Sequence, residues 1–385
     1  MIGISRLYCG SAEASDAIRY AKHRSAPKPV LVWNCTRQCN LSCLHCYSRS
    51  DALAARDELS TQEARLMLQD AAGYGCPVVL FSGGEPMMRG DIMQLIAYAT
   101  SLGLRTVLST NGTLIDKQAA QQLASAGVGY VGVSLDGLES VHDKFRGRSG
   151  AFQSALRAIR LCRQAGVKTG VRFTLCRRNV QEIDSIFKLL RDEDIPRACF
   201  YHLVYSGRGE SLSSEDLSHD QTRLAVDRII DNTAELFADG MKKEILTVDN
   251  HADGPHLYMR MLREGNPRAE EAGRMLRMAG GNSSGRGIGC VSWDGTVHPD
   301  QFWRQENLGN IRHKPFSAIW SDESNETLRR LRNSAEWIKG RCLTCRFLDM
   351  CGGNFRSRAL SATGDAWQSD PACYLSDEEI KEDKP

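Results

Sequence analysis

Three cysteines on one short segment carry the most specific chemical signal in this chain of 385 residues. Cys39, Cys43 and Cys46 lie in the run Cys-Asn-Leu-Ser-Cys-Leu-His-Cys. Three thiolates at this spacing can hold three irons of a 4Fe-4S cube, which leaves the fourth iron open to a substrate or cofactor. The alternative is a structural zinc, which needs a fourth ligand, and His45 lies between two ligands and is badly placed to be that group. The triad therefore favours a cluster.

Polar and glycine residues follow the next apolar runs of the chain. The segments are Gly83-Gly84-Glu85-Pro86, Ser109-Thr110-Asn111-Gly112 and Ser134-Leu135-Asp136-Gly137, and Arg172 lies within a later run. Glycine lets a backbone approach a ligand closely, and a guanidinium can grip a carboxylate with two parallel hydrogen bonds. The hydroxyl and carboxylate side chains suit ribose hydroxyls, although tight turns and helix N-caps use the same residues.

Four further cysteines gather near the C-terminus. Cys342, Cys345 and Cys351 are spaced C-x2-C-x5-C, and Cys373 follows. Four thiolates suffice for a closed iron–sulfur cluster and equally for a structural zinc. The residues alone leave both alternatives open.

Apolar runs alternate with amphipathic stretches between residues 29 and 205, which indicates βαβ units and a parallel sheet. Strands are expected at Val30–Trp33, Val78–Ser82, Arg105–Thr110, Tyr130–Leu135, Lys168–Leu175 and Cys199–Val204. Helices are expected at Thr61–Tyr74, Asp91–Leu102, Asp116–Ala126, Ala151–Ala165 and Val180–Asp192. Six repeats predict an α/β fold, an open (β/α)6 partial TIM barrel, with its site at the C-terminal ends of the strands. Gly75, Gly103, Gly127 and Gly166 follow helices, where a left-handed cap is wanted.

The remaining segments divide around this barrel. Residues 1–28 form an N-terminal extension, 29–205 the barrel, 206–280 a bridge with the pattern of amphipathic helices, and 281–385 a C-terminal domain with the second cysteine group. Chain length agrees with two or three modules.

Composition excludes several classes of function. The chain is 42% hydrophobic and 25% charged with a net charge of +2, which argues against a nucleic-acid or membrane-surface protein. No apolar run is long enough for a transmembrane helix, and the N-terminal residues lack the pattern of a signal peptide. Fourteen cysteines in a chain of this kind are more plausibly metal ligands than disulfides. We therefore expect a cytoplasmic protein.

The cysteine triad and the three strand-end segments occur in the order and spacing of the radical SAM superfamily, which the chain resembles. The resemblance implies that S-adenosylmethionine chelates the open iron and is cleaved to a 5′-deoxyadenosyl radical, with electrons from a flavodoxin- or ferredoxin-type reductant. His45 would pack against the adenine. The residues that would contact S-adenosylmethionine are His45, Gly83, Gly84, Glu85, Pro86, Ser109, Asn111, Ser134, Asp136 and Arg172.

The C-terminal cysteines resemble part of a SPASM or twitch extension, which carries auxiliary 4Fe-4S clusters. The chain departs from the full pattern, because Phe355 and Asp300 stand where two further cysteines would be required. The resemblance then implies one auxiliary cluster, held by Cys342, Cys345, Cys351 and Cys373, and two 4Fe-4S clusters in the whole chain. Cys290 is left over near the vacated site.

Further segments resemble radical SAM deacetylases of the siroheme-dependent haem pathway: 1–10, 201–209, 249–254 and 286–295. The resemblance implies a tetrapyrrole substrate, didecarboxysiroheme, that loses two acetate side chains to give Fe-coproporphyrin III. The related haem d1 enzymes, which replace propionates of the same substrate by oxo groups, and peptide-modifying SPASM enzymes are alternatives. The candidate substrate-binding residues are Arg208, His251, Arg286 and Arg304, and the catalytic candidates are Cys290 and His251.

Overall fold

The computed structural model describes residues 1–13, 16–20 and 28–381, and a twisted sheet organises them. Its strand order is β1-β8-β7-β6-β5-β4-β3-β2-β9-β10-β11. The parallel strands follow one another in the chain: β2 (Val30–Thr36), β3 (Val78–Gly83), β4 (Arg105–Thr110), β5 (Tyr130–Ser134), β6 (Thr169–Leu175), β7 (Arg197–His202) and β8 (Glu244–Val248). The predicted partial barrel of six βα repeats is therefore present, and it gains a seventh parallel strand.

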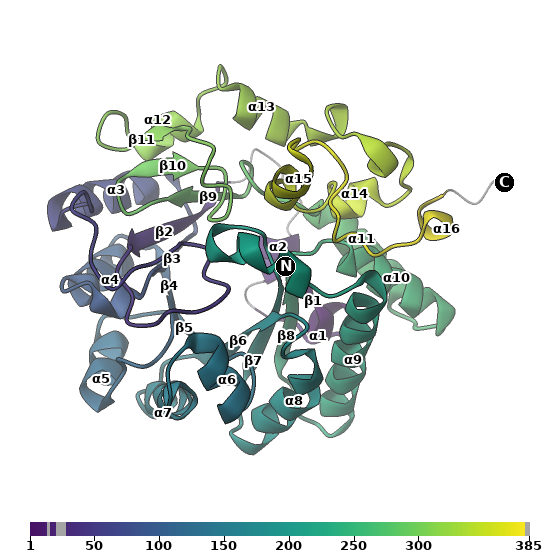
Figure 1. Cartoon of the computed structure of the whole chain (residues 1–385), viewed down its shortest axis with the longest axis horizontal. Coiled ribbons are helices and arrows are strands. Elements are labelled where there is room, and N and C mark those ends of the chain that lie inside the picture. The colour runs from purple at the N-terminus through teal and green to yellow at the C-terminus, as the bar shows by residue number, and fades with distance from the viewer. Residues whose placement is uncertain (14–15, 21–27, 382–385) are drawn as a thin grey trace.

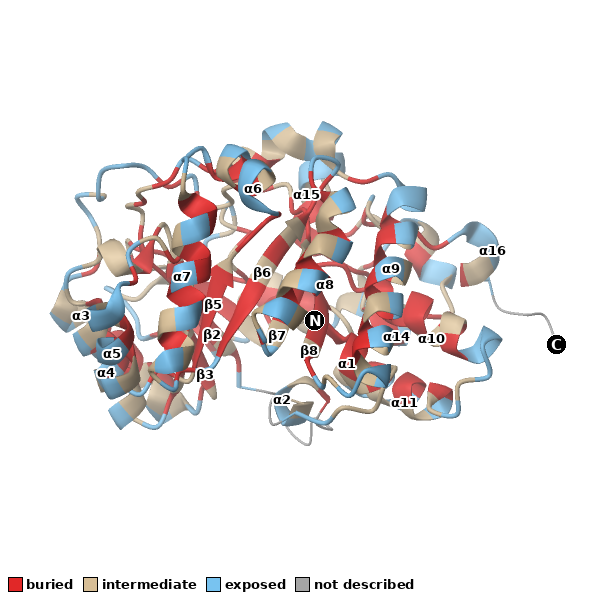
Figure 2. Cartoon of the chain, turned by 90° about the horizontal axis from the view of Figure 1, so that it is seen from below, coloured by how far each residue is buried: buried red, intermediate tan, exposed pale blue. Residues whose placement is uncertain are grey.

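Helices on the outer side of the sheet connect these strands (Figure 1). They are α3 (Thr61–Tyr74), α4 (Ile92–Ser101), α5 (Lys117–Ser125), α6 (Glu139–Arg146), α7 (Ala151–Gln164), α8 (Ile183–Asp192) and α9 (His219–Ala238). Their inner faces are buried against the strands and their outer faces are exposed (Figure 2). The predicted glycine caps are confirmed, since Gly75, Gly103, Gly127 and Gly166 all have φ between +74° and +91°. The short helix α6 was not predicted.

The segment 206–280 differs from the helical bridge that its sequence pattern indicates. It contains α9, α10 (Asp253–Arg263) and α11 (Ala269–Ala279), but also strand β8, which pairs with β7 in parallel. Residues Ile2–Gly3 add β1 to the far side of β8 in the antiparallel sense. Two short elements follow β1 in the N-terminal region: α1 (Ile4–Leu7) and α2 (Asp16–Tyr20). Residues Ile2–Gly3 are therefore part of the sheet.

The C-terminal region continues the same sheet from its other edge. Strand β9 (Ile288–Val291) pairs in parallel with β2, and β10 (Thr296–His298) and β11 (Gly309–Asn310) follow in the antiparallel sense. Short helices complete this region above the barrel (Figure 1): α12 (Phe316–Trp320), α13 (Glu326–Arg332), α14 (Leu348–Cys351), α15 (Arg356–Thr363) and α16 (Asp377–Ile380). Because β9 lies beside β2, both cysteine groups are attached to one continuous sheet.

Candidate active site

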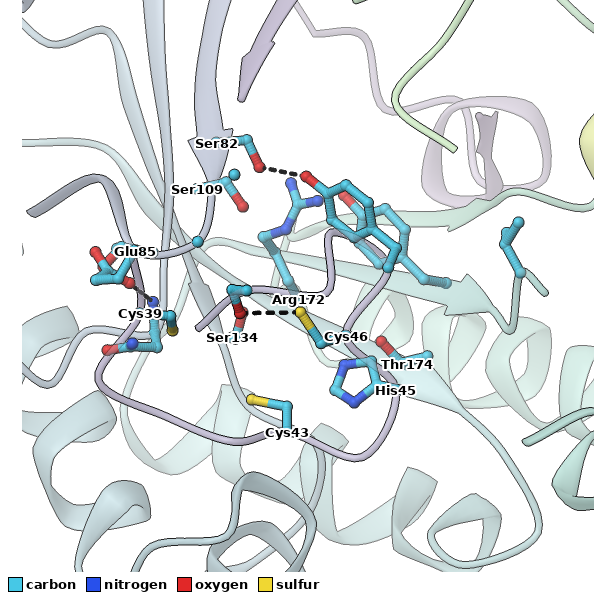
Figure 3. Close-up of a pocket in the computed structure, with 18 of the residues that line it drawn as sticks. Cys39, Cys43, His45, Cys46, Ser82, Glu85, Ser109, Ser134, Arg172 and Thr174 are labelled. Carbon is cyan, nitrogen blue, oxygen red and sulfur yellow. Dashed lines mark hydrogen bonds between the residues drawn. The ribbon is translucent and has the colours of Figure 1, made fainter. Parts of the chain in front are cut away.

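The three cysteines of the triad line one cavity at the C-terminal ends of the parallel strands. Cys39, Cys43 and Cys46 also pack against one another around Leu41, and Figure 3 shows them on a single loop around a common space. This position agrees with the predicted barrel mouth. Within the described residues, no three His, Cys, Asp or Glu side chains converge as the ligands of a single metal ion would. The fit to a cluster therefore rests on three thiols facing one shared cavity.

The three thiols have different surroundings. Burial raises the pKa of the Cys39 thiol to about 11. Burial also opposes ionisation of Cys46, but hydrogen bonds from Ser48 and Ser50, with oxygen–sulfur distances of 3.3 and 3.1 Å, outweigh it and lower the pKa of that thiol. Donors of this kind stabilise a thiolate, which is the form that ligates iron.

Most residues predicted to contact S-adenosylmethionine line the same cavity. They are His45, Gly83, Gly84, Glu85, Ser109, Asn111, Ser134 and Arg172. They come from the triad loop and from the ends of β3, β4, β5 and β6, so the strand ends bring segments far apart in sequence to one place (Figure 3). Pro86 and Asp136 are not among the lining residues. Pro86 begins a short helical turn after β3.

The Gly83-Gly84 pair is required by the backbone of the triad loop. A Cβ on Gly84 would lie 2.1 Å from the carbonyl oxygen of Gln38, and one on Gly83 would lie 2.6 Å from that of Thr36. The Gly84 amide donates to the Thr36 carbonyl at 2.8 Å, and the Glu85 amide donates to the Gln38 carbonyl at 2.7 Å. The glycines therefore dock the start of the cysteine loop onto the end of β3, a close approach that only glycine permits.

Glu85 is buried and spans two strand ends. Its carboxylate accepts hydrogen bonds from the Thr110 hydroxyl at 2.7 Å and from the Asn111 amide at 2.7 Å. Burial nevertheless raises the pKa of this carboxyl above its ordinary value. Glu85 therefore fixes the end of β4 beside the end of β3. Gly83 and Gly84 of the same segment line the cavity and remain available to a ligand.

Asp136 has a different role from the ribose contact that its motif suggests. Its side chain is fully buried and forms an ion pair with Arg146 on α6. One carboxylate oxygen also accepts from the Thr174 amide at 2.8 Å. A sugar contact would have to compete with this ion pair, so the structure assigns Asp136 to the support of Arg146.

Arg172 lines the cavity, as Arg146 does. It points into the site between Ser109 and Cys46 in Figure 3, and its guanidinium carbon lies 4.4 Å from the centre of the Tyr201 ring. The same residue lines a second cavity inside the barrel, together with Tyr201 and Asp249. A carboxylate in either cavity could therefore meet this guanidinium.

The three arginines predicted to bind substrate all contact backbone carbonyls. Arg208 donates to the carbonyls of Cys43 and Ser50 at 2.9 and 2.8 Å. Arg304 donates to the Ser48 carbonyl at 2.8 Å and stacks over Trp293. The Arg286 guanidinium lies beside the carbonyls at the end of α11, at 3.3 Å from that of Gly280. None of the three lines the cavity with the triad. Arg208 and Arg304 hold the cysteine loop.

The two catalytic candidates lie apart from the triad. Cys290 is fully buried beside Asn34, burial raises the pKa of its thiol, and it lines neither cavity. His251 lines the second cavity, and burial holds the pKa of its imidazole well below the ordinary value. Cys290 is therefore placed as a core residue, whereas His251 keeps access to a ligand inside the barrel.

Some residues of the cavity were not predicted from the sequence. Tyr47 and Arg146 line it, and so do His202 and Asp249, which lie in the segments 201–209 and 249–254 that the sequence had singled out. The Tyr47 hydroxyl contacts Asn34 and Ser82 at 2.9 and 2.8 Å. Asp249 has a φ of +67°, and burial raises the pKa of its carboxyl to about 6. Such backbone strain and displaced pKa values concentrate at functional sites, but neither can be recognised from single residues in a sequence.

The four C-terminal cysteines also form one group. Burial raises the pKa of the Cys351 thiol well above its ordinary value. The nearby thiols of Cys342, Cys345 and Cys373 act in the same direction. The Cys345 amide donates to the Cys342 carbonyl at 3.3 Å. Cys351 therefore lies near the other three thiols, and their role as the ligands of one cluster stays a prediction.

Other side chains fill the place where further cysteines of a full SPASM pattern would be expected. Asp300 accepts hydrogen bonds from the Ser284 hydroxyl and from the amides of Phe302 and Trp303. The Phe355 ring packs edge-on against Phe302, with centroids 5.5 Å apart. Asp300 and Phe355 therefore have partners within the protein, and neither position carries a thiolate.

A buried ion pair joins this region to the barrel mouth. Arg358 and Asp370 are both fully buried and interact at 2.8 Å. Arg358 also donates to the carbonyls of Leu203 and Asp249, both at 2.9 Å. Removing one partner of such a pair would leave a buried charge unpaired. The pair therefore fixes the C-terminal region against the segments that follow β7 and β8.

All fourteen cysteines lie in the described part of the chain, and none of them forms a disulfide. Among the described residues, no helix combines the length and apolar character needed to cross a membrane.

Comparisons with known proteins identify the family. The model of the radical SAM superfamily matches residues 33–217, and that of an iron–sulfur cluster-binding domain, SPASM, matches residues 284–346. The chain is 52% identical to Fe-coproporphyrin III synthase of Methanosarcina barkeri, with 99% of each chain covered. It is 39% identical to pre-heme d1 synthase of Dinoroseobacter shibae, over 92% of this chain and 88% of the relative.

Solved structures show the same fold. Streptococcus suis SuiB bound to the precursor peptide SuiA matches with a TM-score of 0.71 and 18% identity, over 91% of this chain and 76% of that one. At this identity the likeness concerns the fold alone. The matching domain models and the full-length relatives together show that this chain belongs to the radical SAM superfamily, among the members with a C-terminal SPASM domain.

Proposed function

We propose that this protein is a radical SAM enzyme of haem biosynthesis that removes two acetate side chains from didecarboxysiroheme to give Fe-coproporphyrin III. The observation that carries the proposal is the 52% identity to Fe-coproporphyrin III synthase along 99% of both chains. A cavity that combines three thiols, strand-end polar groups and a buried arginine supports it.

In this proposal Cys39, Cys43 and Cys46 hold the cluster that binds S-adenosylmethionine, and Cys342, Cys345, Cys351 and Cys373 hold one auxiliary 4Fe-4S cluster. When bound, the first cluster and S-adenosylmethionine supply a 5′-deoxyadenosyl radical. The internally bonded Asp300 and Phe355 support a total of two clusters. We expect a low-potential electron donor of the flavodoxin or ferredoxin class and a cytoplasmic location.

The protein residues position the reactants and limit the space around them. Ser134 and Arg172 face the cavity and can hold the carboxylate of S-adenosylmethionine, while His45, which stacks on Phe145 with centroids 4.5 Å apart, can support the adenine. The second cavity, which contains His251 and shares Arg172 with the first, can receive part of an anionic tetrapyrrole. Such fixed placement of reacting groups is what a radical enzyme supplies to its cofactor.

The test is anaerobic reconstitution with iron and sulfide, followed by incubation with dithionite, S-adenosylmethionine and didecarboxysiroheme. Mass spectrometry should show a tetrapyrrole that has lost two acetate arms, together with 5′-deoxyadenosine. The second candidate is the pre-heme d1 reaction, which is supported by the 39% identity to pre-heme d1 synthase. Oxo groups in place of propionates would favour this candidate. An unchanged tetrapyrrole beside abundant 5′-deoxyadenosine would reject both reactions.

A further inference from the structure

Helix α6 places an arginine against the cysteine loop. Arg146 is the last residue of this helix and is only 7% exposed. Its Nη1 atom lies 3.5 Å from the sulfur of Cys43, within the range of a hydrogen bond to sulfur. Arg146 also lines the cavity of the triad. A permanently charged side chain thus lies within hydrogen-bonding distance of this thiol.

Asp136 holds this arginine in place. The carboxylate pairs with Nη2 of Arg146 and is itself fully buried. The backbone of Asp136 is fixed from both sides, because its amide donates to Nδ1 of His142 at 3.0 Å and its carbonyl accepts from Asn179 at 3.0 Å. The guanidinium is therefore held by a fixed carboxylate and also contacts a thiol.

The ion pair presents its positive end to the cysteine. Nη1 of Arg146 lies against the sulfur of Cys43, while the Asp136 carboxylate pairs with Nη2 of the same guanidinium. The pair is formally neutral, yet a thiolate at Cys43 experiences a net attraction because the guanidinium is the nearer charge.

We propose that Arg146, held by Asp136, raises the reduction potential of the 4Fe-4S cluster bound by Cys39, Cys43 and Cys46. Reduction adds one negative charge to the buried cluster, and a nearby cation stabilises the reduced form more than the oxidised form. Hydrogen bonds to cluster sulfurs and local charge are established determinants of such potentials. The inference rests on the proposed cluster at the triad and is independent of the substrate, so either proposal can fail alone.

The test is an EPR-monitored redox titration of the reconstituted full-length protein. Only the component of the reduced signal that changes on addition of S-adenosylmethionine is followed, because it reports the cluster at the triad. Arg146→Gln should shift its midpoint potential to more negative values, whereas Arg146→Lys, which retains the charge, should shift it less. The double variant Asp136→Asn/Arg146→Gln leaves no unpaired buried carboxylate, and it decides the question if Arg146→Gln alone does not retain iron.

Arg148→Gln is the matched control, because this exposed arginine lies two residues beyond the end of the same helix. It should leave the midpoint potential unchanged. A wild-type potential in the double variant would overturn the proposal, as would an equal shift in Arg148→Gln, which would indicate a general effect of surface charge.

Discussion

Replacing Arg208 by alanine should release the cysteine loop rather than weaken substrate binding. The side chain donates two hydrogen bonds to loop carbonyls, at 2.9 Å to Cys43 and at 2.8 Å to Ser50. A hydrogen bond with a charged partner contributes about 1.5–3 kcal/mol. Because Arg208 is partly exposed, we take the lower value for each bond and expect a loss of about 3 kcal/mol.

This loss should be concentrated on the loop. The loop is also held by the main chain at position 208, because the Arg208 amide donates to the Cys46 carbonyl at 2.9 Å. Alanine at this position retains that bond. Arg208→Ala should therefore fold but, after anaerobic reconstitution, retain about half of the wild-type iron, one cube of two. It should form little 5′-deoxyadenosine.

The assays are iron content, denaturant unfolding and binding of didecarboxysiroheme followed by its Soret band. Arg178→Ala is the control, because Arg178 is exposed and its side chain forms an ion pair with the partly exposed Glu215. Ion pairs near the surface contribute little to stability. Full iron and normal stability together with weakened tetrapyrrole binding would refute this reasoning and restore Arg208 to the substrate site.

Three further predictions concern the two metal centres and the helix beside the triad. Replacing Cys39, Cys43 and Cys46 together by alanine should leave about half the iron, one cube of two, and abolish 5′-deoxyadenosine; continued cleavage would contradict the triad's role. Wild-type protein should bind about eight irons, four per cube, and about twelve would reveal another auxiliary cluster. Burial lowers the pKa of His142 to about 4 from 6.5, so the unfolded state takes up a proton that the folded state excludes. Stability in urea should therefore fall as the pH decreases from 6.5 towards 4, and His142→Gln should show a smaller decrease.

The sequence predicts the repeating part of the fold because each βα unit carries its own local signals. Strand-forming residues, amphipathic helices and capping glycines recur in order, and the structure confirms them. Strands β1 and β8 were missed for a physical reason. Ile2–Gly3 is too short to show a period, and Glu244–Val248 is a brief apolar run between helices, so only pairing with β7 defines it as a strand.

Part of the candidate site could likewise be predicted from the sequence, and part could not. Cysteine spacing and strand-end motifs are local, and they led directly to residues of the observed cavity. The roles of Arg208, Arg304 and Asp136 were not predictable, because each depends on which distant backbone or side chain lies opposite it. An arginine in a glycine-containing loop looks identical in sequence whether it meets a ligand or a carbonyl.

The pairing of β9 with β2 has a consequence for how this protein can be divided. Residues 288–291 cover the strand that leads into the cysteine loop, and a strand without such a neighbour offers unpaired amide and carbonyl groups to other chains. A fragment that ends after the barrel would expose this edge along Val30–Trp33. We therefore expect the two regions matched by separate family models to fold poorly when each is produced alone. A shortened gene product would be expected to aggregate before it could acquire iron.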